Sequence, residues 1–431
     1  MAVLEPDTAF WALVDNSDLD EALVGNLVVN YQKQMAEFRD EMDRLRFGLT
    51  PSAVYFNPTE RCNFNCRYCY LPERMRRDGT TMTEKKLLYA LARLSVFFSE
   101  TLPGGEIPQL IFHGSEPMLA KDAVFTGIKA FHEKFHFGIQ TNAVLLDDDA
   151  ISFLTEHGVG IGISLDGPSA EIADATRKNW KGSGAFSQVV RVMDKLKGYP
   201  AFNVITTVTS ANVHALPDMV DFYHEHGVKV VMLNPVRCTL KGGHDLKPDN
   251  NVLAKIFCRA LDRTFELFEK SGQKLIVANF ANVLAGIVGP TGRRLMCDIS
   301  PCGGGRCFFA VSATGDVFPC SEFIGFSEYK GGNLYQDDLN AVLKSAPFQD
   351  VTARKIEAIE PCGNCAIRHF CGAPCPAEVK MVSGTLSAPS PYCEFYEQQV
   401  KYAFRIIAKG REEAYLWDGW QEETEETFKI I

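Results

Sequence analysis

The chain has 431 residues with 44 basic and 54 acidic side chains, which gives a formal charge of −10. At roughly 100–200 residues per domain this length predicts two or three domains, and the acidic balance excludes nucleic-acid binding through bulk charge. The first residues form no signal segment, and no apolar run approaches the ~18–20 residues of a membrane helix. We therefore expect a cytoplasmic protein without a membrane or nucleic-acid partner, in which the 14 cysteines stay reduced and bind metal or act in catalysis.

Residues 1–49 are predicted to form an N-terminal helical segment. Apolar side chains recur there at spacings of three and four, as on one face of an amphipathic helix: Val24, Leu27, Val28, Tyr31, Met35, Phe38, Met42 and Leu45. We interpret this helix as packed on the body of the protein, and a docking surface for a partner peptide is the alternative.

Residues 50–250 alternate short apolar runs with amphipathic stretches, which is typical of parallel βα units. The predicted strands are Ala53–Asn57, Gln109–Phe112, Phe137–Thr141, Gly160–Leu165, Asn203–Val208 and Lys229–Asn234. The predicted helices between them are Glu84–Phe98, Ala123–Phe135, Asp148–His157, Phe186–Leu196 and Leu216–His226. This alternation predicts an α/β fold, a partial (β/α)6 TIM-like barrel, in which catalytic residues follow the carboxyl ends of the strands.

Two further regions follow the predicted barrel. A helix over about 253–270 belongs to a helical bridge that we place at residues 251–295. From residue 296 to residue 431 the chain is rich in Cys, Gly and Pro, with short strand signals at 308–311 and 317–318. This change in composition predicts a small Cys-rich α+β domain.

Three cysteines lie close together directly after the first predicted strand: Cys62, Cys66 and Cys69. Thiolates at this spacing can hold one soft metal centre. Because zinc and iron–sulfur sites usually take four protein ligands, three cysteines leave one coordination position open. A zinc site completed by a distant residue is the alternative. The CxxxCxxC array, with Tyr68 before its last cysteine, resembles the radical SAM superfamily.

This resemblance implies a [4Fe–4S] cluster held by the three thiolates, with S-adenosylmethionine (SAM) on the fourth iron. In that family an electron, from a donor such as flavodoxin or ferredoxin, cleaves SAM to methionine and a 5′-deoxyadenosyl radical. The radical abstracts hydrogen from the substrate, so the cofactor carries the difficult chemistry. The cysteines Cys62, Cys66 and Cys69 are thus the catalytic ligands that the resemblance implies.

Motifs at later strand ends extend the resemblance. Gly114-Ser115-Glu116-Pro117 after the second strand is similar to the family's GGEP motif, although Ser115 replaces a glycine. Ser164-Leu165-Asp166-Gly167-Pro168 after the fourth strand is similar to its ribose-contacting segment. Arg177 stands where the family pairs an arginine with the methionine carboxylate, a task that suits a guanidinium. The cofactor contacts implied by the resemblance are Tyr68, Gly114, Ser115, Glu116, Asn142, Ser164, Asp166 and Arg177.

A second set of cysteines lies in the last third of the chain. Its spacing, with Gly315 between the first two members, resembles the SPASM extension of radical SAM enzymes: Cys302, Cys320, Cys362, Cys365, Cys371, Cys375 and Cys393. The resemblance implies two auxiliary [4Fe–4S] clusters and three clusters in total. Cys302, Cys320 and Cys375 would belong to the first auxiliary cluster, and Cys362, Cys365, Cys371 and Cys393 to the second. The fourth ligand of the first stays open between Cys297, Cys307 and a substrate group. A pair of zinc ribbons is the alternative.

SPASM-bearing enzymes modify peptides or proteins, so the resemblance implies a maturase that installs a thioether or C–C crosslink in a ribosomally made precursor peptide. Formation of formylglycine, as in anaerobic sulfatase maturases, is the alternative among enzymes. Those maturases carry a general-base Asp after the hairpin cysteine, whereas this chain has Ser321 and then Glu322. A zinc-stabilised binding protein is the non-enzymatic alternative. The segment before the first strand is too short for a leader-binding winged helix, so a separate leader-binding protein is a further expected partner.

Overall fold

We describe the protein from a computed structural model, which covers residues 1–15, 21–289, 293–371 and 375–420. The end of the predicted Cys-rich domain, residues 421–431, therefore lies outside the described residues. The strands are β1 (Ala2–Glu5), β2 (Phe10–Leu13), β3 (Ala53–Phe56), β4 (Gln109–Phe112), β5 (His136–Thr141), β6 (Gly160–Ser164), β7 (Phe202–Val208), β8 (Val230–Pro235), β9 (Ile276–Val277), β10 (Phe308–Val311), β11 (Asp316–Phe318) and β12 (Gly332–Asn333).

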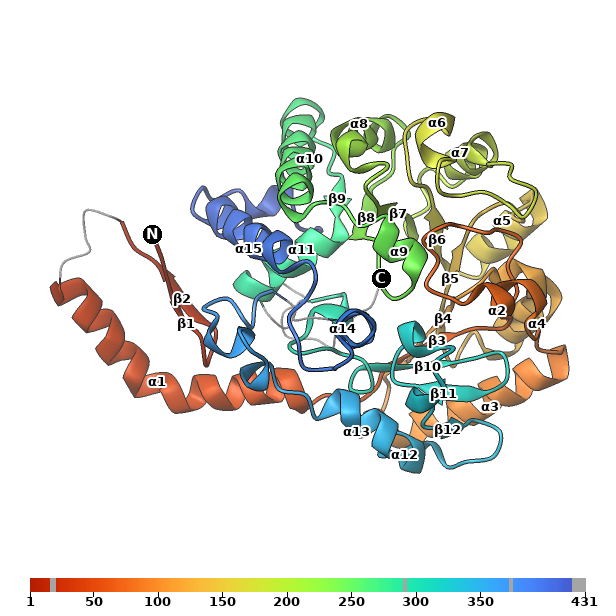
Figure 1. The fold of residues 1–431 in the computed structure, drawn as a ribbon, viewed down its shortest axis with the longest axis horizontal. Helices are drawn as coiled ribbons and strands as arrows, with labels where there is room; N and C mark the ends of the chain where they lie inside the picture. The colour runs from red at the N-terminus through yellow and green to blue at the C-terminus, as the bar shows by residue number, and fades with distance from the viewer. Residues whose placement is uncertain (16–20, 290–292, 372–374, 421–431) are drawn as a thin grey trace.

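The α-helices are distributed along the whole chain (Figure 1). They are α1 (Glu21–Phe47), α2 (Glu73–Asp78), α3 (Glu84–Thr101), α4 (Lys121–Phe131), α5 (Asp148–Glu156), α6 (Ala170–Ala173), α7 (Phe186–Lys195), α8 (Leu216–Glu225), α9 (Lys241–Asp245), α10 (Asn250–Ser271), α11 (Ala278–Val288), α12 (Leu339–Val342), α13 (Ala346–Thr352), α14 (Pro376–Ser383) and α15 (Cys393–Ile407).

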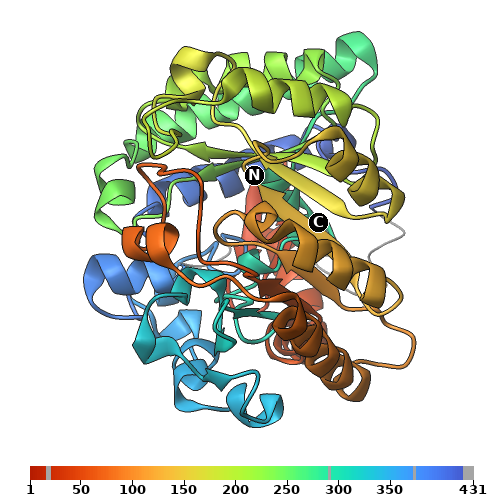
Figure 2. The ribbon, with the colours of Figure 1, turned by 90° about the vertical axis from the view of Figure 1, so that its right-hand side faces the viewer.

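One ten-stranded sheet forms the centre of the molecule, in the order β12-β11-β10-β3-β4-β5-β6-β7-β8-β9. Strands β3 to β8 pair in parallel and in chain order. The helices between them lie along the outside of the sheet (Figures 1 and 2). This arrangement confirms the predicted α/β class and the partial (β/α)6 barrel.

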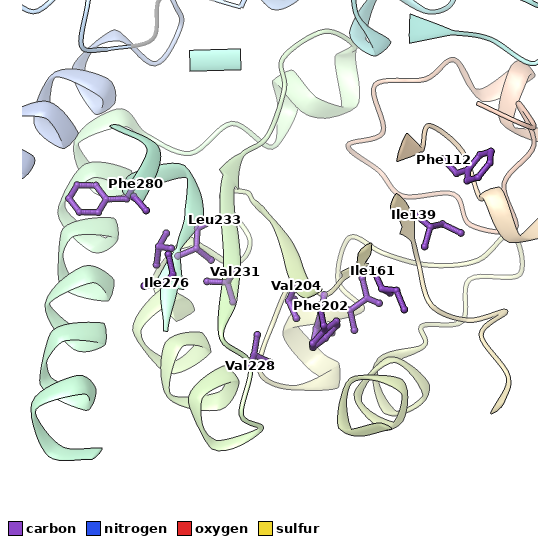
Figure 3. Packing of buried hydrophobic residues seen from close by; sticks show 14 of the residues in the cluster. Phe112, Ile139, Ile161, Phe202, Val204, Val228, Val231, Leu233, Ile276 and Phe280 are labelled. Carbon is purple, nitrogen blue, oxygen red and sulfur yellow. The ribbon is translucent and has the colours of Figure 1, made fainter. Parts of the chain in front are cut away.

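The strands form because their apolar side chains are buried on the face of the sheet that the outer helices cover. Phe112 of β4, Ile139 of β5 and Ile161 of β6 are at most 1% exposed. Val204 of β7 and Val231 of β8 are fully buried, and Figure 3 shows these residues lining up between the strands and the outer helices. The core thereby holds the strand ends, and the loops that follow them, in fixed positions.

The Cys-rich region continues the barrel sheet. Strand β10 pairs in parallel with β3, with Phe308 opposite Ala53 and Val311 opposite Phe56. Strands β11 and β12 then extend the sheet in antiparallel pairing. The hydrogen-bonded sheet therefore crosses the domain boundary that we predict at residue 296.

The N-terminal segment contains an element that the sequence pattern does not predict. Strands β1 and β2 pair as an antiparallel hairpin before α1, which agrees with the expected helix. The hairpin is anchored where Trp11 Nε1 donates to Ile287 O at 2.9 Å and where Arg368 pairs with Asp7. Most of α1 is exposed, although the ring of Tyr31 packs against Phe10 of the hairpin in a tilted arrangement, 5.2 Å between centroids. No helix in the described part of the chain is both long enough and apolar enough to cross a membrane.

Candidate active site

A single cavity of about 380 Å³ is lined by the loops at the carboxyl ends of the barrel strands and by the Cys-rich region. Residues from both predicted cysteine sets line it. The contributions of the barrel include Cys62, Cys66, Cys69, Tyr68, Gly114, Ser115, Asn142, Ser164 and Arg177. The contributions of the Cys-rich region include Cys297, Cys302, Cys320, Cys371 and Cys375. The fold thus brings together residues that are more than 300 positions apart in the sequence.

The loop that carries Cys62, Cys66 and Cys69 is held by backbone hydrogen bonds rather than by regular structure. Asn65 N donates to the carbonyl of Lys178 at 2.7 Å, and Cys62 N donates to the carbonyl of Arg76 at 2.8 Å. All three cysteine side chains are partly exposed in the cavity wall. Three thiols fixed in this way can act as the soft ligands of one cluster.

The segment after β4 presents backbone and a small hydroxyl to the cavity. Gly114 has φ +99°, and a Cβ atom there would lie 2.1 Å from Asn57 Nδ2, so no larger residue fits without displacement. The Ser115 hydroxyl donates to Glu60 O at 2.6 Å. Glu116 is fully buried behind this segment and does not line the cavity. Its carboxylate accepts hydrogen bonds from Thr141 Oγ1, Asn142 N and Met118 N at 2.7, 2.9 and 3.1 Å. Glu116 therefore fixes the loops after β4 and β5 to one another.

A buried charge network lies beside the cysteine loop. Tyr68 donates its hydroxyl hydrogen to Asp166 Oδ2 and accepts from Arg177 Nη1 at 2.8 Å. Asp166 is fully buried and lies 3.9 Å from the same guanidinium nitrogen. Burial raises the pKa of the Asp166 carboxyl, and the Arg177 guanidinium opposes that shift. Tyr68 and Arg177 line the cavity, whereas Asp166 does not. Asp166 therefore contacts both residues from outside the cavity wall.

Four cysteines of the Cys-rich region, Cys297, Cys302, Cys320 and Cys375, line the opposite part of the same cavity. Gly304 separates two of them, since a Cβ atom there would lie 3.4 Å from both Cys302 Sγ and Cys320 Cβ. Burial raises the pKa of the Cys320 thiol, and the neighbouring Cys302 and Cys375 thiols add to the shift. The four thiols therefore surround one part of the cavity and influence one another electrostatically.

The two rival ligands of the first auxiliary set occupy different surroundings. Cys297 is exposed in the cavity wall, where Cys320 and Cys302 act on its thiol. Cys307 is 1% exposed and packs with Phe308 and Met296 in a small apolar cluster. The Cys307 side chain is not among the residues that line the cavity. The structure therefore brings Cys297, and not Cys307, to the side of the cavity that holds the other three thiols.

Three members of the second auxiliary set, Cys362, Cys365 and Cys393, do not line the cavity. Cys393 and Cys365 both act on the thiol of Cys362, and burial is the largest cause of the raised pKa of that thiol, about 11. Cys371 lies at the cavity instead, with its thiol 3.8 Å from the carbonyl of Arg368. The two cysteines outside both patterns, Cys238 and Cys258, do not line the cavity. Among the described residues, no three Cys, His, Asp or Glu side chains converge closely enough to hold a single metal ion.

Several cavity residues were not assigned to the site from the sequence. Buried atoms without a hydrogen-bond partner line the space between the two cysteine sets: Tyr70 Oη, His113 Nδ1 and Glu322 Oε2. Burial lowers the pKa of His113 to about 4 and raises that of Glu322 to about 7. The position of His113 directly after β4 is the signal that could have identified it, because residues that follow barrel strands face the site.

Arg237 is another cavity residue that the sequence pattern does not identify. It follows β8 by two positions, lines the cavity, and lies 3.6 Å from the fully buried Glu378 Oε2. Glu378 also accepts a hydrogen bond from Cys238 N at 2.8 Å. A guanidinium and buried carboxylates between two thiol sets form a polar, enclosed space that suits a substrate group more than a packed core.

The donor chemistry fits iron–sulfur clusters at both ends of the cavity, because thiols are the ligands that such clusters take. The space between them contains unpartnered polar atoms, which require a hydrogen-bonding ligand or water. At the barrel end, Gly114 and Arg177 both line the cavity, and a guanidinium there is able to bind a carboxylate.

Comparison with known proteins identifies two domains in the chain. Residues 56–223 match the model of the Radical SAM superfamily, and residues 302–366 match that of the SPASM iron–sulfur cluster-binding domain. An uncharacterised protein of Archaeoglobus fulgidus is 40% identical over 94% of this chain and 92% of its own length. A cysteine-type anaerobic sulfatase-maturating enzyme of Clostridium perfringens is 23% identical over 83% of this chain and 98% of its own. The mycofactocin maturase MftC of Mycobacterium tuberculosis is 24% identical over 80% of this chain and 83% of its own length.

Two solved structures share the fold. The anaerobic sulfatase maturase anSMEcpe with bound AdoMet superimposes with a TM-score of 0.74 at 22% identity, over 87% of this chain and 98% of that chain. SuiB of Streptococcus suis bound to its precursor peptide SuiA superimposes with a TM-score of 0.60 at 14% identity, over 89% of this chain and 84% of that chain. At these identities the likeness establishes the architecture.

Proposed function

We propose that this enzyme modifies a residue of a ribosomally made precursor peptide and forms a thioether or C–C crosslink in it. The chain belongs to the radical SAM superfamily and carries a SPASM domain. The observation that carries the proposal is the shared cavity. Thiols of the barrel loop and thiols of the Cys-rich region line one space, with unpartnered polar atoms between them. A substrate group in that space would contact both ends at once.

The cofactors of these two domains are SAM and [4Fe–4S] clusters. We assign Cys62, Cys66 and Cys69 to the cluster that binds SAM. When bound, this cluster and SAM supply an electron and a 5′-deoxyadenosyl radical, which removes a hydrogen atom from the substrate. An external protein such as flavodoxin or ferredoxin is the electron donor in this proposal.

The protein's own residues bind and orient SAM in this proposal. Gly114 and Ser115 offer backbone groups to the methionine end, and Ser164 and Asn142 line the part that suits the ribose. Arg177 would bind the carboxylate as a guanidinium fork. Tyr68 and Asp166 support this role, because Tyr68 accepts a hydrogen bond from Arg177 and Asp166 lies behind both side chains, outside the cavity wall.

We further propose that Cys297 completes the first auxiliary ligand set with Cys302, Cys320 and Cys375. Its place in the cavity wall beside them supports this choice. The burial of Cys307 in an apolar cluster argues against the rival. Cys362, Cys365, Cys371 and Cys393 remain our proposed ligands of the second auxiliary cluster.

Peptides as substrates have independent support among the similar proteins. SuiB has been solved with its precursor peptide SuiA, and MftC is named a maturase of mycofactocin. Formylglycine formation is the second candidate, because sulfatase-maturating enzymes match 83% of this chain. The position after Cys320 carries Ser321 here, while Glu322 brings a buried carboxylate to the cavity. The mass of the product separates crosslinking from formylglycine formation at a cysteine; formylglycine formation at a serine also removes two hydrogens and is recognised by the reaction of its aldehyde with a hydrazide.

The test uses the full chain reconstituted anaerobically with iron and sulfide, then incubated with SAM, dithionite and the peptide encoded beside its gene. Crosslinking removes two hydrogens from the peptide and retains its sulfur. Formylglycine formation from cysteine removes the sulfur. Cys66→Ala is the inactive control, and Cys258→Ala, outside both cysteine patterns, should keep activity. Release of 5′-deoxyadenosine with an unchanged peptide mass would reject the crosslinking proposal for that peptide.

A further inference from the structure

A second cavity, of about 270 Å³, lies where the N-terminal hairpin and α1 meet α11 and the Cys-rich region. The residues that line it are all different from those that line the catalytic cavity. Its apolar wall comes from all of these parts of the chain: Phe10, Trp11, Phe38, Met42, Ile287 and Phe370. Trp11 fixes the hairpin in this place, because its Nε1 donates to Ile287 O at 2.9 Å.

Two buried nitrogen atoms of the lining residues have no hydrogen-bond partner: Arg293 Nε and His369 Nε2. His369 is 3% exposed, and its Nε2 lies 3.5 Å from Glu357 Oε1, beyond the roughly 2.7–3.2 Å of an N–H···O hydrogen bond. The hydrogen bonds that Arg293 makes to described residues all go to backbone carbonyls, those of Asp298, Gly286 and His369. Buried polar atoms are rarely left unpaired, so the cavity needs an acceptor for the Nε–H group of Arg293.

This combination of an apolar wall and an unpaired N–H group indicates the kind of ligand. An apolar side chain suits the wall, and an oxygen beside it accepts from Arg293. A peptide offers both groups together, because each residue carries a backbone carbonyl next to its side chain. The charges of the wall favour a neutral ligand. Arg46 donates two hydrogen bonds to Glu357 at 2.7 and 3.0 Å, and the carboxylate of Glu41 lies on the same wall as Arg293. A peptide segment therefore fits the cavity better than a free anion.

The second cavity adjoins the same two segments of the Cys-rich region as the catalytic cavity. Asp298 lines the catalytic cavity, and the next residue, Ile299, lines the second one. In the same way, Phe370 lines the second cavity and Cys371 the catalytic one. A ligand in the second cavity thus lies close to the reaction site without contacting the residues that form it.

We propose that the second cavity is a docking site for a segment of the precursor peptide away from the reacting residue. This segment inserts an apolar side chain and places a backbone carbonyl against Arg293. The inference rests on the proposed peptide substrate. It gives a role to the half-buried stripe of Phe38, Met42 and Leu45 on the otherwise exposed α1. Docking here contributes to peptide binding and not to the chemical step.

The test fills the cavity and measures peptide binding apart from catalysis. Met42→Trp places a larger side chain in the cavity, and Arg293→Lys removes the Nε–H group while keeping the charge. Val29→Trp is the matched control, because Val29 lies on the same helix, is 49% exposed and does not line the cavity. The probe is the fluorescently labelled peptide encoded beside the gene. Its Kd for the reconstituted full chain is measured by fluorescence anisotropy with SAM but without dithionite, and KM and kcat are measured with dithionite.

We expect Met42→Trp and Arg293→Lys to raise Kd and KM roughly tenfold, as for the loss of a central contact in an interface. Their kcat should stay near the parent value, and Val29→Trp should behave like the parent protein throughout. Parent-like Kd and KM in a Met42→Trp protein that melts like the parent would overturn the docking site. If Met42→Trp melts at a lower temperature, Arg293→Lys decides, since parent-like binding in that variant overturns the site as well. A parent protein that binds no peptide refutes the proposed substrate itself, and the two failures are thereby distinguished.

Discussion

Asp166→Asn tests whether the buried carboxylate holds the arginine that we propose for the SAM carboxylate. Asp166 is fully buried, accepts from Tyr68 and from Thr207 N at 2.9 Å, and lies 3.9 Å from Arg177. The substitution keeps the size of the side chain and removes its charge. Arg177, which is 13% exposed, would then lose its carboxylate partner without gaining solvent.

The size of the effect follows from this geometry. Two unit charges 3.9 Å apart interact by about 4 kcal/mol at an effective dielectric constant of 20. Removal of one partner of a buried pair costs about 3–5 kcal/mol, and asparagine avoids the burial of its own charge. We therefore expect a loss of about 3 kcal/mol, at the lower end of that range. In a domain of barrel size this corresponds to a fall of roughly 6–12 °C in the melting temperature.

The assay combines thermal melting of the reconstituted protein with equilibrium dialysis of SAM. We expect a lower melting temperature and roughly tenfold weaker SAM binding, equivalent to about 1.4 kcal/mol, because Arg177 is no longer held in one position. Asp221→Asn is the matched control, since its pair with Arg263 is partly exposed and contributes little. If Asp166→Asn melts and binds SAM like the parent protein, the carboxylate does not anchor Arg177 and the reasoning fails.

Three further predictions concern single residues of the site. Cys297→Ala should lose the iron of one auxiliary cluster, whereas Cys307→Ala should retain about twelve irons per chain; iron analysis showing the reverse would exchange their roles. Gly114→Ala should abolish SAM binding in dialysis, since its φ of +99° and the 2.1 Å approach to Asn57 leave no room for a methyl group. His113, whose pKa is lowered to about 4 by burial, takes up a proton less readily when folded, so stability should fall as the pH falls from about 6.5 towards 4. At pH 5 this contribution is ~2 kcal/mol, and urea unfolding of His113→Gln should show a shallower dependence on pH than the parent protein.

The barrel could be predicted from the sequence because its strands are continuous apolar runs that alternate with amphipathic helices. Such patterns show which side chains of an element are buried, and this information lies within the short stretch of sequence that forms the element. Strands β1 and β2 lie before the alternating region, and β9 has only two residues, so the alternation of apolar runs with helices does not reveal them. The hairpin of β1 and β2 gains its contacts from distant segments, such as the hydrogen bond from Trp11 to Ile287 O.

The site could be predicted most directly where its residues lie within one motif. The array from Cys62 to Cys69 and the Gly114 segment are contiguous, so their spacing carries the information. Cys297 and Cys307 stand at equal distances from Cys302 in the sequence, so spacing does not decide which of them faces the cavity. The path of the backbone decides it. Cys307 immediately precedes β10 and packs into the core, whereas Cys297 precedes the turn and faces the cavity. Arg237 and Glu378 meet across two regions, so no local pattern could pair them.

The pairing of β10 with β3 has a consequence for the reaction we propose. Strand β3 leads directly into the loop of Cys62, and β10 directly follows the segment of Cys302 and Cys307. A hydrogen-bonded ladder, rather than a flexible linker, therefore sets the separation between the two cysteine sets. The ring of Tyr55 on β3 contacts Phe308 on β10 at 5.4 Å between centroids, which adds side-chain packing to the ladder. With both ends of the cavity joined by this ladder, we expect the substrate residue to be selected by its fit to a space of constant length.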